Sequence, residues 1–303
     1  MNYWTKVNPK GYKVLKKIIS QDEVFEIRKN LDSFFSGYPK KRMLNLEDSI
    51  KEVKSIENIQ LNKSLLSSIS SLFSDGDWKY VNDFQVLKNM ASKGRGGWHA
   101  DCNSQYSMPH LNKDMSLQNY KFLKIGLYLQ GPECKFGSSI ETIPYSHLLP
   151  KWGYKLLTFC LNKTFFGEFL ARLISVKLDK LVDSGDCILF DCRLIHRSSP
   201  VYGEDTNSDL FNKVGGAYEI HKPGENKYAF YFEVGDSKSC IQFLRSNIER
   251  VKYDNDNFFF EYLSKNKEYF FDIFSTNYKK KLFNKIAFLE EEDLIKIKKF
   301  KGD

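Results

Sequence analysis

The sequence predicts a mainly β fold with helices around it, arranged as a barrel or as two facing sheets. The middle of the chain holds several short apolar segments bounded by turn residues, which is the pattern of buried strands. Helical spacing of apolar residues is found near the N-terminus and again from about residue 237. Two histidines and a carboxylate lie beside the predicted strands but far apart in sequence, and a barrel or double sheet can bring such residues together.

The chain opens with a predicted strand followed by two helices. Residues 11–15 are strand-like. Ser20 and Glu23 have the spacing of a capping box, which marks the start of a helix. Apolar residues then follow at helical spacing: Val24, Ile27, Leu31 and Phe34. A second helix is expected at about residues 62–73.

The strands of the middle region are separated by turn residues. They are predicted at residues 78–88, 122–130, 138–143, 187–191 and 227–234. Residues 94–97 form a glycine-rich turn directly before Trp98, which allows a close approach of the backbone to a ligand. The last strand alternates, so that its odd positions share one face: Lys227, Ala229, Tyr231 and Glu233.

The domain organisation follows from these segments. Residues 1–236 are expected to form one domain, and residues 237–303 a helical C-terminal extension packed on it. Residues 148–173 are a strongly apolar helical insertion, either packed on the sheet or forming an apolar wall over a substrate. Residues 200–226 are polar, with four glycines and two prolines, and are expected to be a long loop of the kind used as a lid or binding loop.

Composition limits the classes of function. The net charge is +8, but 46 basic residues are interleaved with 38 acidic ones. The densest basic stretches, residues 279–281 and 296–301, are explained more simply as a solvated helix face than as a nucleic-acid groove. No apolar run is long enough for a membrane span. The N-terminus lacks the apolar core of a signal peptide, and the six cysteines lack CxxC spacing, so reduced thiols and a cytoplasmic location are expected.

The candidate metal ligands are His99, Asp101 and His196. Residues two apart on an extended segment point to the same side, so His99 and Asp101 can reach one ion, and His196 follows a predicted strand. Two histidines and one carboxylate occupy one face of an octahedral Fe(II) and leave three positions open. The alternative is an ordinary turn with a capping aspartate and a buried histidine. Asp191 is a candidate partner for an imidazole, and Asp186 is expected to shape a turn.

The segments, taken in order, resemble the phytanoyl-CoA dioxygenase family of Fe(II)/2-oxoglutarate-dependent oxygenases. The resemblance rests on GYKVLKKIISQDEVFEIRKNLDSFF, GWHAD, KIGLYLQ, SSIETIPYSH and GDCILFDCRLIHRSSP, which span roughly residues 10–235. It implies a double-stranded β-helix (jelly-roll, cupin-like) core buttressed by helices. It also places the metal triad on His99, Asp101 and His196.

The resemblance further implies a basic residue, usually arginine, that holds the far carboxylate of 2-oxoglutarate on the strand after the distal histidine. The matching position is Lys227, which departs from the family in residue type and in its longer distance from His196. Three other basic residues compete for this role: Lys213, Arg197 and Arg193. Further residues lie on strands that can face the interior and touch the cosubstrate: Gln85, Lys124 and Tyr128.

The implied activity is hydroxylation of a small or medium-sized organic molecule, using O2 and 2-oxoglutarate and releasing succinate and CO2. Asp101 favours hydroxylation, because halogenating relatives lack this carboxylate, while desaturation and ring formation stay open. One alternative is a nucleic-acid demethylase of the AlkB type, but no concentrated basic patch flanks His99 or His196. The other is a jelly-roll binding module without turnover.

Overall fold

A computed structural model describes residues 9–39, 41, 43–45, 53, 59–73, 77–81, 84–93, 97–101, 121–134, 137–201, 211–214, 217–220, 226–253 and 286–287. Within these ranges no helix has the length and apolar character needed to span a bilayer.

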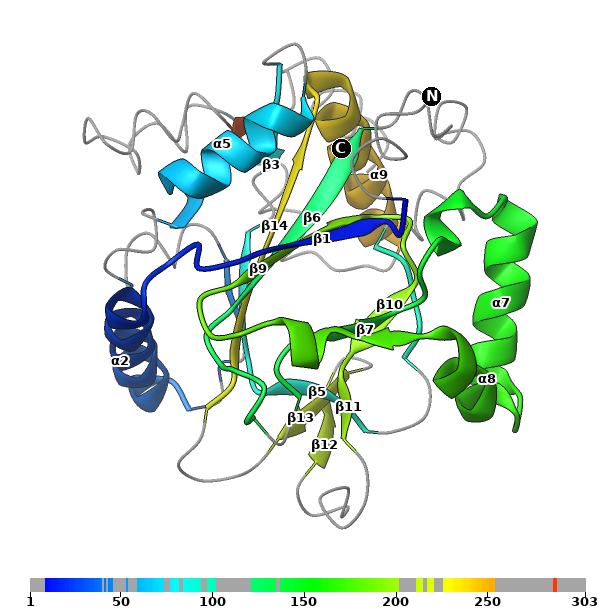
Figure 1. Cartoon of the computed structure of the whole chain (residues 1–303), viewed down its shortest axis with the longest axis horizontal. Helices are drawn as coiled ribbons and strands as arrows, with labels where there is room; N and C mark the ends of the chain where they lie inside the picture. Colours follow the sequence, from blue (N-terminus) through cyan, green and yellow to red (C-terminus); the bar gives the residue numbers. More distant parts are fainter. Residues whose placement is uncertain are drawn as a thin grey trace.

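The larger sheet is built around two long strands that form its centre (Figure 1). In spatial order its main strands are β1 (Tyr12–Leu15), β9 (Cys187–Asp191), β6 (Phe122–Tyr128), β14 (Tyr228–Gly235), β3 (Lys79–Val81) and β15 (Ile286–Ala287). Strand β4 (Gln85–Lys88) also pairs with β14, and β2 (Met43–Asn45) pairs with β4. All of these pairs are antiparallel except β15 with β3.

Shorter strands form the opposite side of the molecule. One group is β10 (His196–Ser198), β7 (Ile140–Thr142) and β8 (Val176–Lys177), and the other is β11 (Pro200–Val201), β5 (Met90–Lys93), β13 (Ala217–Ile220) and β12 (Phe211–Val214). The chain crosses repeatedly between the two sides: β4, β6, β9 and β14 belong to the larger sheet, and β5, β7, β8 and β10 to the shorter groups. This winding is the double-stranded β-helix, so the predicted fold class is confirmed.

Successive side chains of β6 and β14 point to opposite faces of the sheet, so these strands contribute to two separate hydrophobic clusters. Inward-facing side chains meet residues of the opposite side in a cluster that includes Tyr128, Ala229, Ile140 and Leu194. The other face of the larger sheet contributes to the main core beneath the helices, with residues such as Leu123, Ile125, Leu127, Phe230 and Phe232. The predicted facing of the odd-numbered residues of the last strand is therefore confirmed.

Three helices cover the outer face of the larger sheet: α2 (Gln21–Gly37), α5 (Lys63–Leu72) and α9 (Ser237–Tyr253) (Figure 1). The capping box at Ser20 and Glu23 is present. The buried residues of α2 are Val24, Ile27, Leu31 and Phe35. Phe34, expected in this stripe, is only partly buried, because its neighbour Phe35 stacks on Tyr228 and takes the inner position. The α9 residue Phe243 stacks on Phe122.

Two expectations about irregular and helical regions need correction. Residues 200–226 are not simply a loop, because β12 and β13 pair with each other and β13 pairs with β5. The sequence carries a signal for this, since Gly215–Gly216 separates the two strands. In the C-terminal extension, residues 237–253 are helical as expected, but β15 adds a strand beside β3. The rest of the extension lies outside the described residues.

The expected helical insertion at residues 148–173 contains α7 (Lys151–Lys163) and most of α8 (Gly167–Ile174), which ends one residue later. These two helices lie on the opposite side of the molecule from α2 (Figure 1).

Asp186 fixes the turn that leads into β9. Its buried carboxylate accepts hydrogen bonds from the backbone N–H groups of Lys17 and Asp183, both at 2.8 Å, and from the Lys16 ammonium at 2.6 Å. These contacts tie the end of β1 to the turn, which agrees with the expected structural role.

Replacing this carboxylate tests that role. Asp186→Ala removes the acceptor of two backbone N–H groups and of the Lys16 ammonium, and is expected to lower the free energy of unfolding by about 3 kcal/mol in urea titrations. The matched control is Asp183→Ala, which removes an exposed partner of Lys16 and should cost no more than about 0.5 kcal/mol. Equal losses in the two variants would contradict this account.

Candidate metal centre

The two histidines of the candidate metal centre are joined through their backbones. The His99 N–H donates to the His196 carbonyl at 3.0 Å, and the His196 N–H donates to the His99 carbonyl at 2.8 Å. Residues that face each other in an antiparallel bridge project their side chains to the same side. Asp101, two positions after His99, projects to that side as well.

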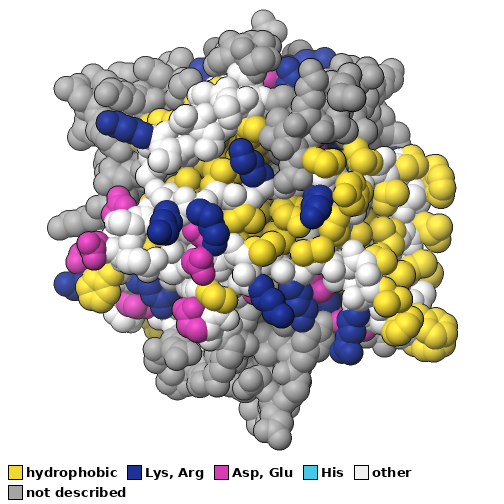
Figure 2. Space-filling view, in the orientation of Figure 1, with side chains coloured by type: hydrophobic (Ala, Val, Ile, Leu, Met, Phe, Trp, Pro, Cys, Tyr) yellow, Lys and Arg dark blue, Asp and Glu magenta, His cyan; other side chains and the backbone are white. Residues whose placement is uncertain are grey.

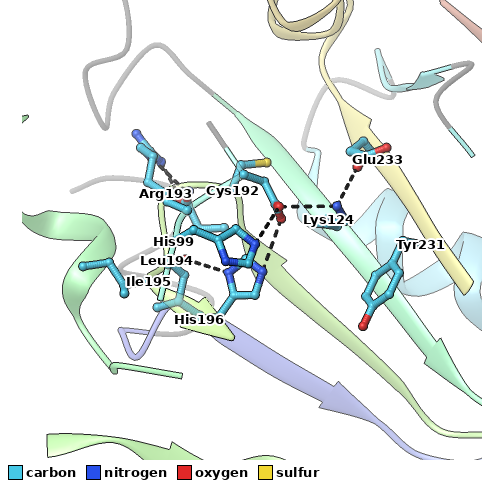
Figure 3. A network of polar contacts seen from close by, with 12 residues as sticks. His99, Lys124, Cys192, Arg193, Leu194, Ile195, His196, Tyr231 and Glu233 are labelled. Carbon is cyan, nitrogen blue, oxygen red and sulfur yellow. Dashed lines mark hydrogen bonds and ion pairs between the residues drawn. The ribbon is translucent and has the colours of Figure 1, made fainter. Parts of the chain in front are cut away.

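The side chains converge as the sequence predicts. His99 Nε2 lies 3.8 Å from Asp101 Oδ1, and His196 Nε2 lies 3.6 Å from Asp101 Oδ2. One ligand atom from each residue lies within 4.8 Å of the other two. Figure 3 shows the two rings close together, with Lys124 approaching from β6. Atoms bound to one ion at roughly 2.1 Å are about 3 Å apart, so small side-chain movements suffice to close the site.

Backbone carbonyls orient both imidazoles. His99 Nδ1 lies 2.8 Å from the Gly97 carbonyl oxygen, and His196 Nδ1 lies 3.0 Å from the Leu194 carbonyl oxygen. With Nδ1 donating to these carbonyls, Nε2 of each ring keeps its lone pair for a metal. Gly97 has a positive φ of 79°, which glycine adopts readily and which turns the chain toward His99.

Asp191 does not orient an imidazole, so this expectation is wrong. Its carboxylate accepts hydrogen bonds from the backbone N–H and the Nε of Arg193, both at 2.8 Å. Arg193 lies two residues later in the same turn, which places its backbone N–H and its guanidinium within hydrogen-bonding distance of Asp191.

The charge states suit metal binding. Burial alone would raise the pKa of the Asp101 carboxyl, but the positive charge of Lys124 and then the two imidazoles outweigh it and hold the pKa at about 2. Burial lowers the pKa of His196 to about 4. At neutral pH, Asp101 is therefore anionic and His196 neutral, and these are the forms that bind metal ions.

One oxygen of Asp101 is left for a further partner. Oδ2 is buried and makes no hydrogen bond to the described residues. A buried carboxylate oxygen without a donor is costly in free energy, and a bound cation would relieve that cost. The side of the centre at His99 is open, because half of that side chain is exposed.

Polar residues on the inner face of the larger sheet adjoin Asp101. Lys124 Nζ lies 3.4 Å from Asp101 Oδ1 and 3.2 Å from Glu233 Oε1, and it sits over the Tyr231 ring. The Tyr231 and Tyr128 hydroxyls are 3.3 Å apart. Burial raises the pKa of both tyrosines, so both hydroxyls stay protonated and can donate. Glu233 and Tyr231 were not predicted as site residues, although the alternation of their strand already placed them on one face.

The four residues predicted to contact the cosubstrate lie at different positions along the strands of this inner face. Lys124 and Tyr128 belong to β6, and Gln85 lies opposite Tyr231 in the register of β4 with β14. Lys227 precedes β14, and its burial lowers the pKa of its ammonium. Lys227 and Glu233 are six positions apart, which corresponds to roughly 20 Å between their backbones along an extended strand.

The competing basic residues have other partners. Arg193 pairs with Asp191. Arg197 pairs with Glu141 and Glu168, and its guanidinium lies over the Trp98 ring. The side chain of Lys213 lies outside the described part of the molecule.

The helical insertion holds the segment that carries His99 and Asp101. The Asn162 side chain accepts a hydrogen bond from the Trp98 N–H at 3.0 Å and donates to the Trp98 carbonyl at 2.8 Å. The Tyr154 hydroxyl accepts a hydrogen bond from the Ala100 N–H at 3.2 Å. Both residues belong to α7, so this helix packs directly against the ligand segment.

No protein-family model matches this sequence, and no curated protein matches it. Similar solved structures include AviO1 from Streptomyces viridochromogenes Tue57, with 13% identity over 77% of this chain and 92% of that one, and a TM-score of 0.47. The non-heme α-ketoglutarate-dependent carbocyclase SnoK from nogalamycin biosynthesis is 14% identical over 78% and 82%, with a TM-score of 0.45. EctD from S. alaskensis, with bound Fe, is 16% identical over 78% and 76%, with a TM-score of 0.49. At such low similarity, the function must be inferred from this chain's own residues.

The contact between α7 and Trp98 is testable without altering a candidate ligand. Asn162→Ala removes both hydrogen bonds to Trp98, and loss of such supporting contacts weakens metal binding by roughly 10-fold or more. The dissociation constant for Fe(II) or Mn(II), measured by titration without oxygen, should rise accordingly. Thr158→Ala is the control, because the Thr158 hydroxyl bonds only to carbonyls of its own helix in the described residues. Unchanged metal affinity in Asn162→Ala would contradict a supporting role.

Proposed function

We propose that this chain is an Fe(II)- and 2-oxoglutarate-dependent oxygenase, with His99, Asp101 and His196 as its metal ligands. The observation that carries the proposal is the convergence of two imidazole Nε2 atoms on a carboxylate whose side chain is only 14% exposed. A set of two histidines and one carboxylate on one face leaves positions open for a chelating cosubstrate and O2.

The residues present fit this cofactor pair. Nitrogen and carboxylate donors suit Fe(II), and the buried Oδ2 of Asp101 lacks a hydrogen-bond donor among the described residues. When bound, Fe(II) and 2-oxoglutarate together with O2 supply oxidation of a substrate C–H bond, with release of succinate and CO2.

The chain's own residues would bind the metal, orient the two imidazole rings and exclude water from the site. The carbonyls of Gly97 and Leu194 fix the rings, so that both Nε2 atoms face Asp101. Phe190 packs edge-on against the His196 ring and closes the inner side of the site. The exposed edge of His99 is then the side from which a substrate approaches.

For the cosubstrate we favour Lys124 over Lys227. Lys124 Nζ already lies beside Asp101, and its charge can balance a second carboxylate there. The protonated Tyr128 and Tyr231 hydroxyls lie deeper on the same face and can donate hydrogen bonds to the far end of a short diacid. Lys227 precedes β14 and lies six positions before Glu233, the residue that pairs with Lys124. Gln85, opposite Tyr231, can add a further polar contact.

Within this class, we propose hydroxylation of a small or medium-sized organic molecule. In a halogenating enzyme, a halide takes the metal position that a carboxylate would otherwise occupy. Here the Asp101 carboxylate would occupy that position, which favours hydroxylation over halogenation. The order of the sequence motifs supports placing the chain with the phytanoyl-CoA dioxygenase family.

The experiment is an anaerobic titration of the chelator-treated protein with Fe(II) and then 2-oxoglutarate. The chelated complex should give a weak visible charge-transfer band, and exposure to O2 should yield succinate. Asp101→Ala should abolish iron binding, whereas Asp22→Ala, an exposed carboxylate change on α2, should leave it unchanged. Binding of Fe(II) without any 2-oxoglutarate complex would contradict the oxygenase assignment and favour a binding module.

A second comparison separates the two lysines. At saturating Fe(II), Lys124→Met should raise the dissociation constant of 2-oxoglutarate by about 10-fold or more, because a charge-assisted contact is lost. Lys227→Met is its matched control, a buried lysine on the same inner face, and should change the constant by less than about 2-fold. The opposite ranking would assign the far carboxylate to Lys227.

A further inference from the structure

The helices α7 and α8 carry a large exposed apolar face. Seven of the twelve large hydrophobic residues exposed in the described part of the chain lie on these helices or between them: Trp152, Leu156, Phe159, Phe165, Phe166, Phe169 and Leu173. Phe165 is 75% exposed and Trp152 72%. Figure 2 shows apolar side chains gathered at the right edge of the molecule, where Figure 1 places these helices. Scattered exposed apolar residues are ordinary, but a patch of this size marks an interaction surface.

The apolar residues form stripes along the two helices. Trp152, Leu156 and Phe159 follow spacings of four and three residues, which align them on one side of α7. Phe166, Phe169 and Leu173 align in the same way on α8. Gly167 allows the helices to meet closely, because a Cβ there would collide with the carbonyls of Leu161 and Cys160.

The segment that carries this face has a net positive charge. Residues 145–182 contain six cations (Lys151, Lys155, Lys163, Arg172, Lys177 and Lys180) and two carboxylates (Glu168 and Asp179), a net charge of 6 − 2 = +4. Glu168 pairs with the buried Arg197, and Asp179 accepts hydrogen bonds from Ser138, Ser139 and Ser199. Glu168 also lies 3.8 Å from Arg172, so the net positive charge of this segment comes mainly from its lysines.

We propose that the α7–α8 face binds the surface of an anionic lipid bilayer, with its aromatic side chains inserted at headgroup depth. An apolar helical face rich in Trp and Phe and bordered by Lys and Arg is the composition of helices that lie in a membrane interface. Anionic headgroups complement the surrounding cations. A second copy of the chain fits less well, because the same cations would face one another across the contact.

The same helix α7 holds the segment of the candidate ligands His99 and Asp101 through Asn162 and Tyr154. The helix that would face the membrane is therefore also a helix that contacts the segment carrying His99 and Asp101. Docking itself does not depend on the oxygenase assignment, and metal-free protein should show it.

The test is co-sedimentation of the full-length, metal-free protein with vesicles of phosphatidylcholine alone or with about 30% phosphatidylglycerol. We expect binding to the anionic vesicles and little to the neutral ones. The combined variant Trp152→Ser, Phe165→Ser and Phe169→Ser should bind at least about 10-fold more weakly. Phe25→Ser on α2 is the matched control, because Phe25 is 66% exposed and Phe169 65%, and it should bind as the unchanged protein does.

Replacing lysines of α7 with glutamates tests whether their positive charge contributes to vesicle binding. Lys155→Glu combined with Lys163→Glu should weaken binding to the anionic vesicles, and Lys29→Glu on α2 should not. All substituted positions are exposed, so the thermal midpoints should stay within about 3 °C of the unchanged protein.

Three outcomes would overturn the proposal. The first is no binding to either vesicle type. The second is equal binding by the triple serine variant and the unchanged protein. The third is a protein that is dimeric in solution, fails to bind vesicles and becomes monomeric in the triple variant, which would assign the face to a second copy of the chain.

Discussion

The reciprocal pair of backbone hydrogen bonds between His99 and His196 is the constraint on which the candidate centre depends. It joins two segments 97 positions apart (196 − 99) and forces both imidazoles to the same side of the backbone. The jelly-roll supplies this meeting, because β10 enters the shorter sheet directly after the turn that follows β9. Without the pair, neither ring would have a defined direction toward Asp101.

The second constraint is electrostatic. Burial of a carboxylate is costly, and here the positive charge of Lys124 offsets that cost. Lys124 is in turn held between Asp101 and Glu233, so two adjacent strands of the larger sheet set the charge of the centre. Within the part of the chain that the structure describes, one oxygen of Asp101 has no donor, and protonated tyrosine hydroxyls lie on the same face of the sheet. The structure thus places an anionic carboxylate beside cationic and donor groups, an arrangement that fits the proposed metal and acidic cosubstrate.

Part of the fold and of the candidate centre could be predicted from short-range patterns in the sequence. The two-residue spacing of His99 and Asp101, the capping box at Ser20 and the alternation of the last strand are short-range patterns with direct geometric meaning. The contacts of Lys124 with Asp101 and of Asn162 with Trp98 depend on how distant segments pack, and no spacing in the sequence encodes them. Asp191 shows the same limit, because its choice of Arg193 over an imidazole depends on side-chain reach within one turn.

The most direct test of the account is a crystal structure of the protein loaded anaerobically with Fe(II). The account predicts one ion bound by Nε2 of His99, Nε2 of His196 and a carboxylate oxygen of Asp101, each at about 2.0–2.2 Å, with Nδ1 of both rings still bonded to the backbone carbonyls. An ion held by other residues, or through Nδ1 of either histidine, would contradict it.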